Sequence, residues 1–365
     1  MKLRFALIGA GWRAMYYVRI AKALPDHFEC VGILCRTAEK AAAVEQNCGI
    51  PTVTSVEAIR NLNPDVVVVA VNKQNIASVA MEWMKQGFLV LSETPAALDI
   101  ETMKQLWEVA EHGKRLVVAE QYLHYPENIA RVALLKQGLI GEPQYTYLSL
   151  AHDYHGMSLL RAFLQVPGTE SYTIAAVPME FPTVRTMTRQ ERVQDGTVFN
   201  AKRTAALIRF ACGKAALYEF DPEQYRSTIR HNLIKIQGVT GEIADTSVRW
   251  LDQQFQSHQA EINTAFRIVE TDDANPNFQS YPEVTGISFN GEDLYQPPFG
   301  FCGLSQDETA IASMLEELGG YARGECDVPY PLLDALNDAA MAVDLQKAVE
   351  SGTVIHSDQT LPWRL

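Results

Sequence analysis

Residues 3–14, LRFALIGAGWRA, constrain the fold of this chain more than any other stretch. The apolar run before Gly9 is typical of a buried strand, and Gly-x-Gly-x-x-Ala at a helix start is the dinucleotide-binding fingerprint. Gly9 permits a tight turn, Gly11 lets a pyrophosphate approach the backbone, and Ala14 allows the helix to pack closely on the strand. The free N–H groups and the positive end of the helix dipole would then face the phosphates. Because any tight strand-to-helix turn can use this pattern, its context decides the interpretation.

That context is a regular alternation of strand and helix signals over residues 1–121. The stretch from Asp65 to Val71 reads DVVVVAV, and its five valines are typical of a parallel strand buried on both faces. Ser55 stands before a helix as a side-chain cap, with Ala58 at the third position after it. Strands are expected over residues 5–8, 29–34, around 53, 65–71, 88–91 and 115–119. A helix-like segment follows the fingerprint through residue 24, and further helices are expected from Ser55 onward and over residues 38–46, 76–86 and 100–112. The alternation predicts an α/β domain with a doubly wound parallel sheet.

The pattern changes after Pro126, and residues 122–365 are expected to form a second, α+β domain. Alternating polar and apolar residues predict a mostly antiparallel sheet, with strands over residues 144–150, 203–210, 214–220, 228–237 and 246–251. Helices are expected over residues 126–136, 155–164, 305–321 and 332–351, and residues 270–300 are rich in loop signals. The sequence therefore predicts two domains, 1–121 and 122–365, which is an ordinary number for this length.

Composition excludes several classes of partner. The chain has 44 acidic and 31 basic residues, and its net charge of −13 argues against nucleic acid or an anionic membrane surface as the main partner. Its six cysteines include no Cys-x-x-Cys pair, which is typical of free thiols in a reducing compartment. Arg13 interrupts the first apolar run too early for a secretory signal, and no later segment is apolar over the length of a membrane helix. We therefore expect a cytoplasmic protein.

A second candidate for chemistry is the segment Glu93-Thr94-Pro95, which follows the strand expected at residues 88–91. Ligands of open α/β sheets bind at the carboxyl ends of strands. A strand followed by a proline-containing turn has the same appearance without binding any ligand. The residues alone leave both interpretations open.

The fingerprint, the DVVVVAV strand and the Glu93-Thr94-Pro95 segment resemble the Gfo/Idh/MocA oxidoreductases, and the order of elements is similar over nearly the whole chain. In that family the corresponding strand ends in Glu-Lys-Pro, and the lysine usually helps to orient or protonate the substrate oxygen. Thr94 stands at the lysine position, and threonine can donate a hydrogen bond but supplies no positive charge. Residues 72–75 also depart from the family's Thr-Pro-Asn, and Gln121 stands where many members carry asparagine.

The resemblance implies that His155 is catalytic, because the family carries a histidine in a segment that enters a helix at this point. Imidazole is a suitable proton donor or acceptor for a carbinol near neutral pH. The family often has acids four residues before and three after this histidine, where this chain has Ala151 and Ser158; His152 and Asp153 can replace them locally. One alternative is a histidine that hydrogen-bonds the helix backbone. Another is a metal held by His152 and His155, but no third ligand is suggested, so we expect no metal.

The end of the second strand predicts which cofactor is preferred. The residue that reads the ribose is expected about 20 residues after the glycines, and NAD-specific proteins usually have Asp or Glu there. This chain has Cys35 instead, followed by Arg36, whose planar fork suits a 2′-phosphate, and by Thr37, which adds a hydroxyl donor. We therefore predict NADP as the preferred cofactor and NAD as the second choice. The alternative is that Arg36 points to solvent beside Glu39 and NAD binds without selectivity.

The candidate site residues come from the fingerprint, the strand ends and the segments named above. Those predicted to bind the cofactor are Gly9, Gly11, Trp12, Arg13, Ala14, Cys35, Arg36, Thr37, Val71, Asn72, Asn75, Glu93, Thr94 and Gln121. Those predicted to contact the substrate are Thr94, Gln121, Tyr122, His124, His152, His155 and Arg226. Buried hinge packing explains the aromatic residues equally well, and a solvated strand edge with surface salt bridges is the alternative for Arg226.

The resemblance implies an enzyme that moves hydride between the nicotinamide ring and a secondary alcohol or its ketone. Sugars, inositols and related polyols are the family's usual substrates. The second domain would bind the substrate, and its sheet would form the interface of a homodimer or homotetramer. Two alternatives stay open, because fold does not settle function. One is a non-catalytic or regulatory NAD(P)-binding protein, favoured by the missing lysine and acids, and the other is hydride transfer to a non-sugar acceptor.

Overall fold

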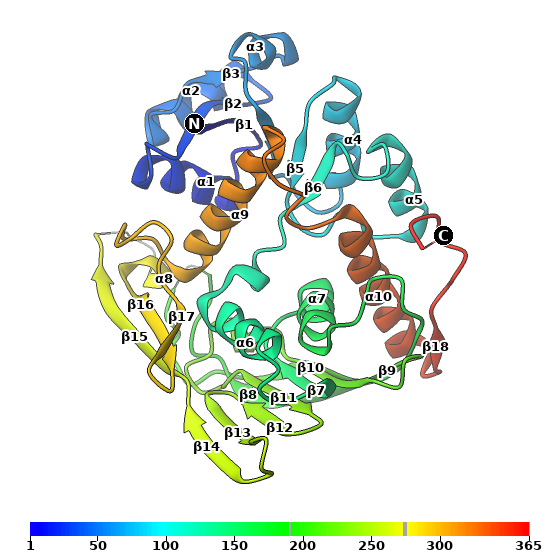
Figure 1. The fold of residues 1–365 in the computed structure, drawn as a ribbon. Coiled ribbons are helices and arrows are strands. Elements are labelled where there is room, and N and C mark those ends of the chain that lie inside the picture. The colour runs from blue at the N-terminus through cyan, green and yellow to red at the C-terminus, as the bar shows by residue number, and fades with distance from the viewer. Residues whose placement is uncertain (190, 273–275, 365) are drawn as a thin grey trace. The chain divides into compact units, whose positions relative to one another are not determined.

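The computed structural model describes residues 1–189, 191–272 and 276–364 (Figure 1). Contacts divide the chain into two compact units, and each is described by itself. The first unit comprises Met1–Tyr125, Phe301–Ala339 and Leu361–Leu365, and the second comprises Pro126–Gly300 and Ala340–Thr360. The predicted boundary at residue 121 lies close to the first passage between the units. The return of the chain to the first unit after residue 300 has no counterpart in the sequence-based division.

The first unit contains a parallel sheet with the strand order β3-β2-β1-β4-β5-β6. Its strands are β1 (Leu3–Ile8), β2 (Phe28–Leu34), β3 (Thr52–Val53), β4 (Val66–Val69), β5 (Val90–Ser92) and β6 (Leu116–Val118). Every residue of β4 is a buried valine, as expected for a parallel strand covered on both faces. The predicted doubly wound sheet is confirmed. The strand order reverses between β1 and β4, and sheets of this kind bind ligands in the crevice at such a reversal.

Local sequence fixes where several helices of the first unit begin. These helices are α1 (Trp12–Ala23), α2 (Ala38–Cys48), α3 (Val56–Asn61), α4 (Ile76–Lys85), α5 (Ile100–Val109) and α9 (Gln306–Ala322). The hydroxyl of Ser55 accepts a hydrogen bond from the backbone of Ala58 at 3.2 Å, which confirms the predicted cap of α3. Ser305 and Glu308 form a reciprocal capping box at the start of α9. This box fixes the backbone around Asp307, a residue of the candidate site.

The second unit contains a sheet with the strand order β14-β13-β12-β11-β7-β10-β9-β8-β18. Its strands are β7 (Pro143–Ser149), β8 (Tyr172–Val184), β9 (Val198–Phe210), β10 (Ala215–Phe220), β11 (Leu233–Gly238), β12 (Gly241–Ala244), β13 (Ser247–Leu251), β14 (Ser257–Glu261) and β18 (Ile355–His356). Strands β7 and β10 are parallel, and the other neighbours are antiparallel. The predicted mostly antiparallel sheet is therefore confirmed.

The remaining elements of the second unit include a smaller sheet. Its strands are β15 (Asn263–Glu270), β16 (Ser280–Phe289) and β17 (Glu292–Tyr295), and its helices are α6 (Pro126–Lys136), α7 (Asp153–Leu164) and α8 (Pro276–Gln279). Helix α10 (Leu332–Ser351) contributes residues to both units. The prediction of loops over residues 270–300 is wrong where β16 and β17 form an antiparallel hairpin. Residues 273–275 of that prediction lie outside the described residues.

Strand β8 was not among the expected strands, and its prolines explain why. Proline cannot donate to a sheet ladder, so Pro178 and Pro182 argue against a strand in the interior of a sheet. In the structure they pair with β9 on one side. On the other side β18 pairs with Thr173 and Ile174, which precede both prolines. The part of β8 that contains Pro178 and Pro182 is therefore an edge of the sheet, where a missing N–H donor is tolerated.

Two features are absent from the residues that the structure describes. None of the helices they form is both long and apolar enough to cross a membrane. Within the same ranges, His, Cys, Asp and Glu side chains form no group of three or more that could hold a metal ion. The cysteines, all of which lie in the described ranges, are free thiols.

Candidate functional site

The turn between β1 and α1 has the geometry that a dinucleotide fingerprint requires. Gly9 has a φ of +111°, and a Cβ there would lie 2.4 Å from the carbonyl oxygen of Ala70, so only glycine fits. A Cβ on Gly11 would meet no atom within 4 Å, so the space beside the start of α1 is open. Gly11 is also the N-cap residue, and no side chain caps the first N–H groups there. Ala14 is fully buried under the turn. These residues fit the pyrophosphate of a dinucleotide.

The loop after β4 lies beside this turn. A Cβ on Gly9 would come within 3.2 Å of the side chain of Val71. The side-chain oxygen of Asn72 accepts a hydrogen bond from the backbone of Asn75 at 3.1 Å, which shapes the entry into α4. Asn72 and Asn75 are both exposed. The structure therefore brings Val71 against the fingerprint and leaves the two asparagines at the surface of the loop.

The residues predicted to read the ribose follow β2. Cys35 is buried, and burial raises the pKa of its thiol, so the side chain is uncharged at neutral pH. Arg36 is exposed and forms no ion pair with any residue in the described ranges. The hydroxyl of Thr37 accepts a hydrogen bond from the backbone of Lys40 at 3.2 Å and caps α2. The loop after β2 thus carries an exposed guanidinium at Arg36, and no carboxylate stands at the position of Cys35.

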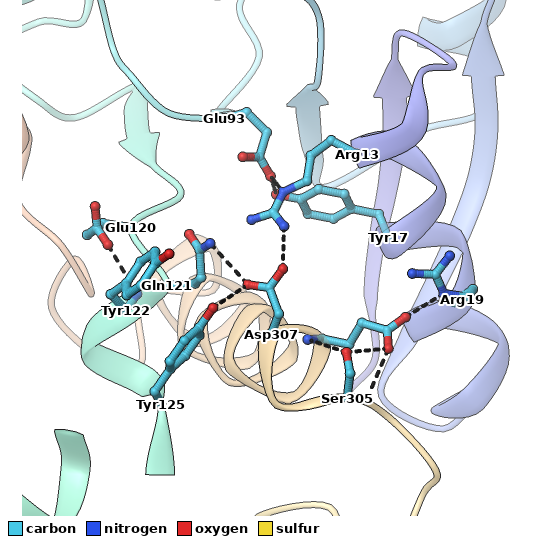
Figure 2. Close-up of polar contacts among 11 residues, drawn as sticks. Arg13, Tyr17, Arg19, Glu93, Glu120, Gln121, Tyr122, Tyr125, Ser305 and Asp307 are labelled. Atoms are coloured by element: carbon cyan, nitrogen blue, oxygen red, sulfur yellow. Dashed lines mark hydrogen bonds and ion pairs between the residues drawn. The ribbon is translucent and has the colours of Figure 1, made fainter. Parts of the chain in front are cut away.

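Arg13, in the first turn of α1, links the fingerprint to the segment after β5. Its Nε donates to Oε1 of Glu93 at 2.9 Å, and its Nη1 donates to Oδ2 of Asp307 at 2.7 Å (Figure 2). The same Oε1 of Glu93 accepts a hydrogen bond from the hydroxyl of Tyr17 at 2.6 Å. Glu93 is buried, and both of its donors come from α1. Helix α1 therefore fixes a carboxylate that the sequence analysis predicts to bind the cofactor.

The charged groups of Arg13 and Asp307 shift each other's pKa values toward the ionised forms. Burial opposes the charge of Arg13, but Glu93 and Asp307 outweigh that effect and raise the pKa of Arg13. Burial likewise opposes the charge of Asp307, but Arg13 and a hydrogen bond from Tyr125 lower the pKa of Asp307. Burial and the neighbouring Glu93 raise the pKa of Tyr17, so its hydroxyl stays protonated and donates. Arg13 and Asp307 are consequently both charged at neutral pH.

Asp307 lies at the centre of this cluster of polar residues, and the sequence analysis did not predict it as a site residue. Its Oδ1 accepts hydrogen bonds from Nε2 of Gln121 at 3.1 Å and from the hydroxyl of Tyr125 at 2.9 Å. On the same turn of α9, Glu308 pairs with Arg19 of α1 at 2.5 Å. The capping box can be read from the sequence and marks the start of α9. No local pattern shows that this start lies against the fingerprint helix.

Two further predicted residues, Thr94 and Gln121, lie just beyond the ends of strands β5 and β6. Thr94 is half-buried and precedes a cis peptide bond to Pro95. Gln121 is 5% exposed and takes part in the network through Asp307. Its amide oxygen, Oε1, is buried and accepts no hydrogen bond from the described residues. The structure therefore brings Glu93 and Gln121 into one network.

The aromatic residues after Gln121 form the short 3₁₀ helix η1 (Tyr122–His124). Tyr122 is buried, and its ring stacks on Tyr125 with the centroids 4.8 Å apart. Burial lowers the pKa of His124, although the carboxylate of Glu317, 3.8 Å away, opposes this effect. The ring of Tyr122 is thus enclosed by its neighbours. A role of either residue at the substrate stays a prediction.

The second unit holds the predicted histidines at the start of α7. His152 is the N-cap residue, and its Nδ1 is hydrogen-bonded to the hydroxyl of Tyr225. Its Nε2 is 3.1 Å from the hydroxyl of Tyr154. The buried ring of His155 packs against Tyr154 with centroids 4.4 Å apart, and against His152 at 4.9 Å. The structure therefore brings His152 and His155 together in an aromatic cluster.

A tyrosine from β10 fixes the backbone that carries these histidines. The hydroxyl of Tyr218 accepts a hydrogen bond from the backbone of Asp153 at 2.9 Å and donates to the carbonyl of Ala151 at 3.0 Å. Asp153 adopts a φ of +40°, which side-chain-bearing residues rarely take. A Cβ on Gly156 would lie 2.4 Å from the ring of Tyr218, so the helix and this ring pack without a gap. Sequence reasoning missed Tyr218, because its partners are long-range.

The predicted residues therefore fall into two groups. All of the predicted cofactor residues belong to the first unit, and His152, His155 and Arg226 belong to the second. Arg226 is half-buried and directly follows the 3₁₀ helix η2 (Pro222–Tyr225), which ends at the partner of His152. Asp221 caps this helix with a reciprocal capping box through Gln224. The cap explains how the loop holds Tyr225 and Arg226 in place.

The first part of the chain is similar to a known protein family. Residues 3–121 match the family model described as "Oxidoreductase family, NAD-binding Rossmann fold", which is that of the Gfo/Idh/MocA proteins. A comparison with curated protein sequences finds no match.

Solved structures extend the similarity of fold to nearly the whole chain. An oxidoreductase from Agrobacterium radiobacter, in complex with NAD+, L-tartaric acid and magnesium, is 16% identical with a TM-score of 0.66, covering 97% of this chain and 98% of that one. A levoglucosan dehydrogenase in complex with NADH and levoglucosan is 18% identical with a TM-score of 0.67, covering 99% and 100%. A putative myo-inositol dehydrogenase from Sinorhizobium meliloti is 17% identical with a TM-score of 0.64, covering 97% and 99%. At these identities the likeness shows the fold.

The turn at Gly9, the strand order and the match of residues 3–121 agree with one another. Over those residues this chain is similar to the NAD-binding Rossmann domain of the Gfo/Idh/MocA oxidoreductase family.

Proposed function

We propose that this protein is an NAD(P)-dependent dehydrogenase that moves hydride between the nicotinamide ring and a CH–OH group of a sugar, inositol or related polyol. The observation that carries the proposal is the open glycine turn at the strand-order reversal, within the matched Rossmann domain. The substrate class is supported by the levoglucosan and myo-inositol dehydrogenases that share the fold. When bound, the nicotinamide cofactor supplies the hydride acceptor or donor.

The residues of this chain would bind both partners and move the proton. Gly9 and Gly11 would cradle the pyrophosphate, and Glu93 would line the nicotinamide end, where Arg13 and Tyr17 hold its carboxylate. His155 would exchange the hydroxyl proton of the substrate. Its buried ring, packed by Tyr154 and His152, meets the requirement that a catalytic side chain keeps one orientation.

Other predicted residues would shape the substrate site. Thr94 and Gln121 would contact the substrate from the ends of β5 and β6. Tyr122, His124, His152 and Arg226 complete the set that we propose for the substrate side. Threonine at position 94 offers a hydroxyl and no charge, so the substrate oxygen would be oriented by hydrogen bonding alone at that point.

For the cofactor we propose a preference for NADP over NAD. The exposed guanidinium of Arg36 and the neutral, buried Cys35 support it. An acid at the position of Cys35 would repel a 2′-phosphate, whereas a guanidinium binds phosphate through paired N–H groups. Two of the solved structures named above, the Agrobacterium radiobacter oxidoreductase and the levoglucosan dehydrogenase, are complexes with NAD+ and NADH, so NAD is the second cofactor of this proposal.

We also propose a homodimer or homotetramer that uses the open face of the large sheet. Apolar side chains gather on that face where β8, β9 and β10 meet, around a shallow groove of about 350 Å³. Val177 is 58% exposed and Leu207 37% exposed on it. Exposed apolar patches on a sheet commonly mark protein interfaces. The free cysteines support the proposal of a reducing, cytoplasmic location.

The second candidate function is a non-catalytic, regulatory NAD(P)-binding protein. Thr94 in place of the family's lysine favours it, as do Ala151 and Ser158 in place of the family's acids. One experiment separates the two: incubation with NAD+ or NADP+ and a panel of polyols, and with NADH or NADPH and a panel of ketoses, following nicotinamide absorbance. Turnover of any member supports the dehydrogenase and rejects a purely regulatory role. Tight cofactor binding without turnover of any member rejects the dehydrogenase.

A further inference from the structure

The amide of Gln121 holds one buried hydrogen-bonding atom that is not paired with any residue in the described ranges. Gln121 is 5% exposed and lies just after β6. Its Nε2 donates to Oδ1 of Asp307 at 3.1 Å, while its Oε1 is buried and has no partner among the described residues. Burying an acceptor without a donor is unfavourable, so such an atom in a native site calls for an explanation.

Asp307 fixes which way the amide is turned. An ionised carboxylate only accepts hydrogen bonds, so it selects the NH₂ group of Gln121 and excludes the oxygen. Arg13 keeps Asp307 in place through Oδ2, and Tyr125 donates to the same Oδ1 as Gln121. Figure 2 shows the amide nitrogen of Gln121 toward Asp307 and the amide oxygen on the other side. The carbonyl end of the amide therefore keeps an orientation in which it can accept from a donor that the described part of the chain does not provide.

The position of Gln121 in the sheet indicates where that donor comes from. A Rossmann fold consists of two mononucleotide-binding halves, and each half binds its nucleotide at the carboxyl ends of its strands. Strands β1, β2 and β3 form the half with the pyrophosphate turn, and β4, β5 and β6 form the other half. Glu93 and Gln121 follow the neighbouring strands β5 and β6 of that second half. The second half is where the nicotinamide nucleotide binds.

We propose that Oε1 of Gln121 accepts a hydrogen bond from the carboxamide NH₂ of the nicotinamide, and that Asp307 is the positioning residue that sets this amide orientation. The inference rests on the dinucleotide binding of the proposed function and adds the residues that read the nicotinamide. A substrate hydroxyl is the other available donor. Cofactor binding measured in the absence of substrate distinguishes the carboxamide donor from a substrate hydroxyl.

The test compares two oxidised cofactors that differ at this group. In 3-acetylpyridine adenine dinucleotide, a methyl ketone replaces the carboxamide and no N–H donor remains. We expect calorimetric titration of the wild type to give NAD+ an affinity about three- to tenfold higher than the analogue, the value of one hydrogen bond. The Gln121→Met variant keeps the side-chain length and removes the acceptor, so its affinity ratio falls to about one.

The role of Asp307 is tested with Asp307→Asn. An asparagine amide can donate as well as accept, so it permits the amide of Gln121 to turn over, and the ratio of affinities falls toward one. Tyr125→Phe is the matched control, because it removes another donor to Asp307 and leaves the carboxylate, so the wild-type ratio is retained. Circular dichroism establishes that each variant is folded.

The outcomes divide the two proposals. If the wild type binds NAD+ and the acetylpyridine analogue with nearly equal affinity, the carboxamide contact is overturned without any variant. The contact is also overturned if Gln121→Met retains the affinity ratio of the wild type. A ratio that Asp307→Asn leaves unchanged overturns the positioning role of Asp307. Wild-type protein that binds neither NAD+ nor NADP+ overturns the proposed function instead.

Discussion

The guanidinium of Arg13 donates to the carboxylate of Asp307 at 2.7 Å, across 294 positions of the sequence. Arg13 stands inside the fingerprint, and Asp307 stands in the first turn of α9. This pair therefore attaches a late helix of the chain to the dinucleotide turn. Asp307 also accepts a hydrogen bond from Gln121, and Arg13 also donates to Glu93.

Arg13→Met should destabilise the protein by about 2–3 kcal/mol, because it leaves two carboxylates without their cation in a mostly enclosed place. The Arg13 side chain is 20% exposed, so solvent compensates only part of the loss. The measurement is the free energy of unfolding in urea. Lys104→Met is the matched control: it breaks a pair with Glu101 whose side chains are 41% and 77% exposed, and should change stability by less than about 0.5 kcal/mol. Equal effects of the two variants would contradict the prediction.

The contribution of Asp307 should depend on pH in a defined direction. Arg13 and the neighbouring donors depress the pKa of Asp307 in the folded protein below its unfolded value, although burial opposes them. Its stabilising effect is therefore fully present above the unfolded pKa, about 4, and is lost as the pH falls through the lower folded pKa. Urea unfolding of wild type and Asp307→Asn at a series of pH values should show a stability difference that shrinks in acid. A difference that stays constant at every pH would sink this idea.

His155→Ala should lower turnover by about 10²–10⁴-fold, the usual value of general acid–base catalysis, with a smaller effect on cofactor binding. Steady-state rates and the dissociation constant of the cofactor provide the two readouts. His258→Ala serves as the control, since His258 is an exposed residue of β14 that pairs with Asp252 at 2.8 Å. Activity of His155→Ala within a few-fold of wild type would make His155 structural.

Thr94→Lys tests the departure from the family's Glu-Lys-Pro segment. Thr94 is half-buried, so a lysine there has a route to solvent for part of its length. We expect a folded variant with a changed substrate range or pH optimum, measured over the same panel of polyols. Thr94→Val removes only the hydroxyl and separates loss of the hydrogen bond from gain of the charge. Unfolding of Thr94→Lys would show that apolar packing encloses this position, where an ammonium group is costly.

Arg36→Ala tests the cofactor preference. Titration with NADP+ and NAD+ should show tighter binding of NADP+ by the wild type and a preference that collapses in the variant, because the exposed guanidinium pairs with the 2′-phosphate. Lys40→Ala, which removes a nearby cation from the exposed side of α2, is the control and should retain the preference. Equal affinities in the wild type, or an unchanged preference in Arg36→Ala, would reject the assignment.

The sequence by itself determined the parts of this protein that depend on neighbouring residues. Gly9 takes a backbone angle that favours glycine, Ser55 caps the helix that it precedes, and the valines of β4 form a buried parallel strand. Each of these follows from the periodicity of side chains or the chemistry of one turn. Such signals remain readable without knowledge of the rest of the chain.

Tertiary structure alone decided which distant residues meet. The sequence shows a capping box at Ser305 but not that Asp307 accepts hydrogen bonds from Arg13 and from the amide of Gln121. Nor does it show that Tyr225 and Tyr154 bind both ring nitrogens of His152. These contacts join different elements, so no local periodicity encodes them. They form only when packing of apolar faces brings the elements together, and that packing selects the partners of each buried polar group.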